Sequence, residues 1–174
     1  MALSIDRAAN VLAGHDNFAQ VEPNLLSAPR NGQVYAQLPC DEAITVLEQG
    51  TFVKYDYAAG KIDFTGEGPW MMVFNEEKLY DERKQMHRDY AMVKSDFYDG
   101  VMTPRVFKMS AGDIYTTNAV ATGEYNVGDN LQPDAKGILT KVSGALKAGL
   151  AAKVVALTTM PDGQPAVKLQ IIAE

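Results

Sequence analysis

The clearest pattern of hydrophobic and polar positions lies near the end of the chain. Two runs of β-branched and aliphatic residues, 154–159 and 166–172, flank the turn residues 160–163, which read Met-Pro-Asp-Gly. Proline presets φ for a turn and glycine accepts a positive φ. In the second run, apolar residues at 167, 169 and 171 alternate with polar residues at 168 and 170. This pattern predicts an antiparallel hairpin with one face covered by earlier strands.

The first two thirds of the chain also contain strand patterns. Short apolar or alternating runs predict strands at 33–38, 44–47, 51–57, 61–65, 90–98 and 105–109. The run at 70–74, Trp-Met-Met-Val-Phe, is continuously apolar, which predicts a central strand buried on both faces. Asn75 is followed by two glutamates, the sign of charge that suits a helix N-terminus, so we expect one short helix over 75–87.

Turn residues recur at short intervals from Gly112 to Gly163, which is typical of a small barrel or sandwich. We therefore predict a mainly β fold: small antiparallel β-barrel or sandwich modules, one short helix and an extended N-terminal arm. The expected division is an arm at 1–30, a β-rich domain with the helix at 31–110, and a small antiparallel β-barrel or sandwich at 111–174.

The expected arm is apolar without an obvious local partner. Pro23 and Pro29 favour extended backbone, and Leu25 and Leu26 lie between them. Two interpretations fit equally well: the arm binds another protein, or it packs on its own domain.

Composition narrows the function classes. The 174 residues are 47% hydrophobic and 22% charged, with a net charge of -6 and dispersed basic residues. Nucleic-acid binding needs clustered Lys and Arg, so we expect no nucleic-acid partner. The sequence has no long apolar run and no signal-peptide pattern, so we expect no membrane association and no export. Cys40 is the only cysteine, which excludes an intramolecular disulfide and suits a reducing compartment such as a bacterial cytoplasm.

Few residues suggest chemistry. The two histidines, His15 and His87, have no zinc-ligand spacing, and Cys40 has no histidine near it in sequence. Asp96 and Asp99 beside Gly100 could touch calcium, but a strand-to-turn junction produces the same residues. We therefore predict no catalytic residues, no metal and no cofactor.

One short stretch resembles an enzyme motif. Residues 59–67, Ala-Gly-Lys-Ile-Asp-Phe-Thr-Gly-Glu, are similar in part to a motif of the trimeric deoxyuridine triphosphatases, in which the aspartate activates water. The stretch is two residues shorter than that motif and lacks its tyrosine. A turn followed by an alternating strand gives the same letters, so we expect Asp63 to be an exposed strand residue.

The C-terminal third carries a second resemblance. Its residues include Tyr-Thr-Thr-Asn at 115–118, Gly-Asp-Asn-Leu at 128–131 and Gly-Ile-Leu at 137–139, before the last strand pair. This region resembles the decoration or cement proteins of tailed bacteriophage heads. The resemblance implies a non-enzymatic structural protein that binds the outer surface of a capsid and stabilises contacts between capsomers. It also implies the major capsid protein as partner, a homo-oligomer (trimer or dimer), and a virion location after synthesis in the host bacterial cytoplasm.

The partner-binding residues expected on the arm are its apolar side chains. They are Leu3, Ile5, Leu12, Phe18, Val21, Leu25 and Leu26. Aromatic residues between 55 and 98, Trp70 among them, fit either core packing or a protein interface. Two alternatives for the whole protein stay open: a tail or connector component, and a small nucleotide hydrolase similar to the deoxyuridine triphosphatases.

Overall fold

The computed structural model describes residues 2–7, 18–27, 38–75 and 91–174. Within them the protein is mainly β, as predicted, with several antiparallel sheets and no sheet that closes into a barrel. The strands are β1 (Leu3–Ile5), β2 (Val21–Leu25), β3 (Val46–Glu48), β4 (Phe52–Asp56), β5 (Lys61–Asp63), β6 (Met71–Val73), β7 (Ala91–Val93), β8 (Val106–Lys108), β9 (Ile114–Thr117), β10 (Gly123–Tyr125), β11 (Asn130–Pro133), β12 (Leu139–Val142), β13 (Ala151–Thr159) and β14 (Pro165–Ala173).

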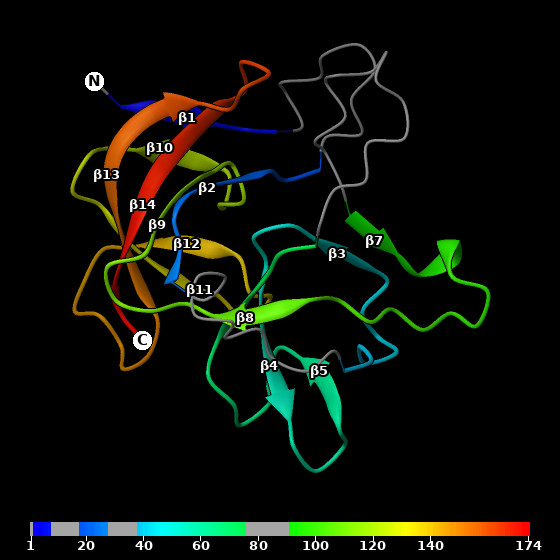
Figure 1. The fold of residues 1–174 in the computed structure, drawn as a ribbon. Helices are drawn as coiled ribbons and strands as arrows, with labels where there is room; N and C mark the ends of the chain where they lie inside the picture. The colour runs from blue at the N-terminus through cyan, green and yellow to red at the C-terminus, as the bar shows by residue number, and fades with distance from the viewer. Residues whose placement is uncertain (1, 8–17, 28–37, 76–90) are drawn as a thin grey trace.

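The C-terminal hairpin is confirmed and forms the centre of the largest sheet. β13 and β14 pair antiparallel, and Gly163 takes a φ of 90° in the turn between them. Val167, Leu169 and Ile171 are buried, as the alternation predicts. The six-stranded sheet has the order β12-β11-β13-β14-β9-β2, and Figure 1 shows its long hairpin curving along one side of the molecule.

The described parts of the expected arm are strands of the body. β1 pairs with β10, joining Leu3 to Tyr125, and β2 pairs with β9 at the edge of the six-stranded sheet, joining Val21 to Thr117. Pro23 is tolerated in β2 because an edge strand does not need every N–H for pairing. Of the two interpretations of this segment, these strands correspond to packing on its own domain.

A second sheet has four strands in the order β5-β4-β6-β8. All three residues of β6 are fully buried, which confirms the prediction of a central strand covered on both faces. Successive residues of β6 face two different clusters of apolar side chains, one on each side of the sheet. Met72 packs with one cluster, and its neighbours Met71 and Val73 pack with the other.

We call these clusters core A and core B. Core A lies between the four-stranded sheet and the C-terminal strands, and it includes Ile5, Val21, Leu26, Phe52, Met72, Phe107, Met109, Tyr115, Tyr125, Leu131, Leu139, Val154, Val167, Leu169 and Ile171. Core B covers the other face of the four-stranded sheet and contains Cys40, Ile44, Leu47, Val53, Tyr55, Ile62, Met71, Val73, Met102 and Val106. Core A therefore draws on all three expected segments of the chain, and the division into an arm and two domains stays a prediction.

Some predicted elements differ from the structure or lie outside the described residues. The strand expected over 90–98 ends at Val93, where the chain turns into a 3-10 helix at Lys94–Asp96 closed by a bond from the Phe97 N–H to the Lys94 carbonyl. The helix expected over 75–87 and most of the strand at 33–38 lie outside the described residues. In the described ranges, no helix is long and apolar enough to cross a membrane.

Candidate functional site

The predicted partner-binding residues fall into different environments. Ile5, Val21 and Leu26 are at most 8% exposed and belong to core A, so in this structure they are core residues and not surface anchors. Leu25 is 46% exposed. Leu3 and Phe18 are half-buried, and Leu12 lies outside the described residues. Partner binding by this set stays a prediction, and Leu25 is its most accessible described member.

Local hydrogen bonds explain how Leu25 comes to be exposed. The pairing of β2 with β9 shifts register between Pro23 and Leu25, which leaves Asn24 as a bulge. The Thr116 hydroxyl donates to Asn24 Oδ1 over 2.9 Å. Just beyond the strand, the Ser27 N–H donates to Asp113 Oδ1 over 2.8 Å, which brings Leu26 into core A. Leu25 therefore lies at the C-terminal end of an edge strand, between two residues that are hydrogen-bonded to the body.

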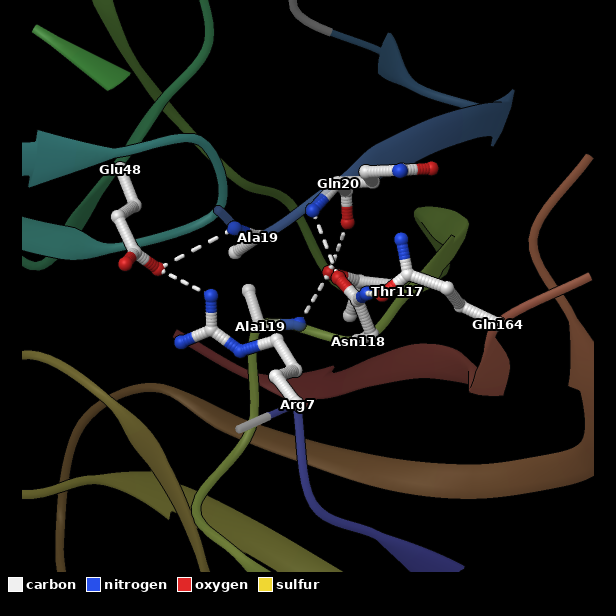
Figure 2. Close-up of polar contacts among 8 residues, drawn as sticks. All are labelled: Arg7, Ala19, Gln20, Glu48, Thr117, Asn118, Ala119 and Gln164. Carbon is white, nitrogen blue, oxygen red and sulfur yellow. Dashed lines mark hydrogen bonds and ion pairs between the residues drawn. The ribbon is translucent and has the colours of Figure 1, made fainter. Parts of the chain in front are cut away.

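Five polar residues fix the start of β2, and we call them the polar clamp: Gln20, Thr117, Asn118, Asp162 and Gln164. Asp162 is half-buried, and the other four are at most 3% exposed. The Gln20 N–H donates to Asn118 Oδ1 over 2.7 Å, and the Thr117 hydroxyl donates to the Gln20 carbonyl over 2.6 Å. Figure 2 shows both side chains directed at the backbone of Gln20. Buried polar groups are costly unless they are hydrogen-bonded, so these bonds tie the backbone of Gln20 to the end of β9.

The hairpin turn completes the polar clamp. Asp162 Oδ2 accepts hydrogen bonds from Gln20 Nε2 over 2.6 Å and from Gln164 Nε2 over 2.8 Å. Asn118 Nδ2 donates to Gln164 Oε1 over 3.2 Å. Three segments far apart in sequence therefore meet at one largely buried network: the entry to β2, the end of β9 and the turn between β13 and β14.

A second contact joins the N-terminal segment to core B's side of the molecule. Arg7 Nη1 lies 2.6 Å from Glu48 Oε2, and the Ala19 N–H donates to the same oxygen over 3.3 Å (Figure 2). Glu48 is the last residue of β3, and both ionic side chains are about one-fifth exposed: 21% for Arg7 and 23% for Glu48. This partly buried ion pair links the end of β1 to β3.

The residues that carry the phage-protein resemblance have structural roles. Tyr115 is fully buried, and burial raises its pKa, so the phenol stays neutral in core A. Thr117 and Asn118 belong to the polar clamp. Burial alone would raise the pKa of Asp129, but hydrogen bonds from Lys141 and the Asn126 N–H, with the charge of Lys141, lower it. The Asp129 carboxylate therefore accepts a hydrogen bond from the Asn126 N–H within its turn. It also forms a 2.7 Å ion pair with Lys141 on β12.

The residues considered as candidates for catalysis or metal binding also make local contacts. The Asp63 carboxylate is half-buried, not exposed as expected, and accepts from the N–H groups of Thr65 and Gly66 and from the Thr65 hydroxyl. Burial, with a smaller effect of the Asp41 charge, raises the pKa of Cys40 to about 11. A thiol with that pKa is protonated near neutral pH and is a poor nucleophile. Asp99 Oδ1 accepts from the Val101 N–H.

Among the described residues, no three His, Cys, Asp or Glu side chains lie close enough together to hold a metal ion. Comparison of the chain with protein-family models, with curated proteins and with solved structures finds no match.

Sequence reasoning missed the polar clamp. Gln20, Asn118 and Gln164 are polar residues in or beside turns, where a pattern of hydrophobic positions predicts exposure, yet each is at most 3% exposed. The one local signal is the Thr-Thr-Asn sequence at the end of a strand, since Thr and Asn side chains often bond to nearby backbone. Here that capacity is directed at a segment 98 residues earlier.

Proposed function

We propose that this chain is a non-enzymatic structural protein of a phage virion that binds the outer surface of the capsid and stabilises contacts between capsomers. Its partner is the major capsid protein, and it acts as a homo-oligomer. The observation that carries the proposal is the role of the residues behind the resemblance. The Thr117–Asn118 pair fastens an extended N-terminal strand, and Asp129 stabilises a turn.

Two further features support a structural role. Asp63, the aspartate of the enzyme-like stretch, is engaged in local hydrogen bonds, and burial keeps the Cys40 thiol protonated near neutral pH. The strand β2 also lies at the edge of the six-stranded sheet, with β9 as its neighbour among the described strands, and its last three residues are exposed. Strand addition at such an edge lets a partner bind through main-chain hydrogen bonds, with an apolar side chain such as Leu25 giving specificity.

The test is cosedimentation of the purified protein with shells of its virus prepared without it, over a range of protein concentrations. We expect saturable binding at a fixed number of copies per capsomer. Solution mass measured in parallel gives the oligomer that binds. No binding by the folded protein, or assembly of the free protein into rings or tubes, would contradict the proposal and favour a tail or connector component.

Leu25→Asp tests the proposed edge. The matched control is Val127→Asp, which places the same charge on a residue that is 63% exposed in another part of the molecule. Loss of a well-packed apolar contact weakens binding by about tenfold or more. We expect that loss for Leu25→Asp and wild-type binding for Val127→Asp, with unchanged thermal unfolding for both. Equal shell binding by the two variants would remove Leu25 and the β2 edge from the proposal.

A further inference from the structure

A small cleft lies beside Trp70, between the four-stranded sheet and the loop that precedes β13. Its volume is about 270 Å³, and its lining includes Lys54, Trp70, Lys108, Gly149 and Glu174. Pockets that enclose drug-sized ligands measure about 300–1,000 Å³. This cleft is therefore of a size for one side chain and its flanking backbone.

The two ammonium groups of the cleft are in different states. Lys108 Nζ lies 3.2 Å from Glu174 Oε2 and is neutralised by it. Lys54 Nζ lies 4.7 Å from the centroid of the Trp70 ring, and no carboxylate of the described residues pairs with it. A lysine ammonium carries three donors, and an aromatic face satisfies its charge only in part. Lys54 is thus a positive charge with donors free for a ligand.

The rim of the cleft offers backbone groups as well. Gln132 holds the loop through both ends of its amide: Nε2 donates to the Lys147 and Leu150 carbonyls, and Oε1 accepts from the Lys147 N–H over 2.9 Å. Between these fixed points lie Ala148 and Gly149. Within the described residues, no hydrogen bond engages the backbone of either one. The loop is therefore held in place while its backbone stays available to a partner.

We propose that this cleft binds the carboxylate side chain of an acidic peptide segment from a protein partner. The carboxylate bonds to Lys54, the aliphatic stem packs against Trp70, and the peptide backbone pairs with Ala148 and Gly149. A free carboxylate gains only the charged hydrogen bond to Lys54, and one such bond is too weak to give measurable affinity by itself, so the peptide backbone is also required. This inference does not rest on the proposed capsid function.

Glu174 is an internal competitor in this arrangement. Its carboxylate already neutralises Lys108 and adds negative charge to the cleft that an incoming carboxylate must enter. Removing the Glu174 charge frees Lys108 and removes the repulsion. Two single substitutions should thus act in opposite directions: Lys54→Met weakens binding and Glu174→Gln strengthens it.

The sequence contains one tryptophan, so intrinsic fluorescence reports on this cleft without labelling. We would titrate the full chain with the capped peptide Gly-Ser-Glu-Glu-Ser-Gly, with its Gln-Gln counterpart, and with sodium acetate. We expect a saturable change for the acidic peptide that weakens with salt, and no saturation for the other two. Lys54→Met should weaken binding by about tenfold and Glu174→Gln should tighten it by about two- to fivefold, the ranges for a charged hydrogen bond and an exposed ion pair.

The control variant is Lys153→Met, which removes an exposed strand lysine outside the cleft and should bind like the wild type. Lys54→Arg keeps the charge and should retain binding, which separates loss of charge from loss of fold. The proposal is overturned if the acidic peptide gives no saturable signal, if the Gln peptide binds equally well, or if Lys54→Met and Lys153→Met behave alike. Saturable binding of acetate alone would overturn the proposal that the ligand is a peptide and would indicate a site for small anions.

Discussion

Core A and core B share one sheet but are assembled in different ways. Among the described residues, core A takes members from Ile5 to Ile171, while the members of core B all lie between Cys40 and Val106. Core A therefore depends on contacts between segments that are distant in sequence. Bringing such segments together costs loop-closure entropy, and this cost opposes the stabilisation that the contacts provide. Core B is the more local of the two, and β6 lies between them with side chains in each.

The largest test of this comparison is a pair of adjacent residues on β6. Met71 faces core B and Met72 faces core A, and both are fully buried. Met71→Ala and Met72→Ala should each lower the free energy of unfolding by about 2–5 kcal/mol, the usual cost of such a cavity. Because the cores share a sheet, we expect each variant to keep a single unfolding transition in guanidinium followed by far-UV circular dichroism. Two separate transitions for either variant would mean that the cores unfold independently.

The next test concerns the contact between the C-terminal module and β4. Gly137 takes a φ of 73°, and a Cβ there would lie 1.8 Å from the Phe52 carbonyl oxygen. Gly137→Ala should cost about 3 kcal/mol or more through overlap and backbone strain. Gly60 has a similar φ of 63° with no atom near its added Cβ, so Gly60→Ala should cost only about 1 kcal/mol. Equal losses in chemical denaturation would show that the close approach to Phe52 contributes nothing.

A smaller effect should follow from opening the polar clamp. Asn118→Ala leaves the Gln20 N–H and the Gln164 Oε1 without their partner, which should cost about 1–3 kcal/mol. The control, Asn126→Ala, changes an exposed side chain and should be near neutral. Hydrogen exchange gives the regional readout: the amides of Gln20 and Val21 should lose protection while those of β5 in core B keep it. Uniform loss across both cores would contradict a local role for the clamp.

The last effect, which appears only at alkaline pH, concerns the thiol of core B. The pKa of Cys40 is about 11 in the folded protein, above the value of a free thiol. The unfolded chain therefore loses its thiol proton first, and folding stability falls as pH rises toward 11. We expect the stability advantage of wild type over Cys40→Ala to shrink by about 2 kcal/mol between pH 8 and 11, since one pKa unit corresponds to about 1.4 kcal/mol. A constant difference over that range would contradict the burial of the thiol as the cause.

The parts of the fold that could be predicted are those specified by local pattern. Alternation from Val167 to Ile171 and the Pro-Asp-Gly turn define the last hairpin, and the apolar run around Met71 and Met72 defines a strand covered on both faces. The partner of β2 could not be predicted. Its sequence, Val-Glu-Pro-Asn-Leu, indicates extended backbone, but nothing in those residues says which distant edge they join.

The candidate sites show the same limit. The predicted partner-binding set contains the exposed Leu25 together with Ile5, Val21 and Leu26, which fill core A. Hydrophobic character alone cannot separate an interface residue from a core residue. The cleft at Trp70 was also invisible in sequence, because Lys54 and Glu174 reach it from elements far apart in the chain.

The place of β2 in the sheet has a consequence for synthesis on the ribosome. Val21 leaves the ribosome well before its pairing partner Thr117, which is followed later still by Val167 on the far side of β9. At about 5–20 residues per second, the wait between Val21 and Thr117 is on the order of 5–20 s. Core B can assemble during that time, because all its residues precede Ser110. The nascent chain thus carries β2 without its sheet partner, beside a partly folded body, until β9 has been made.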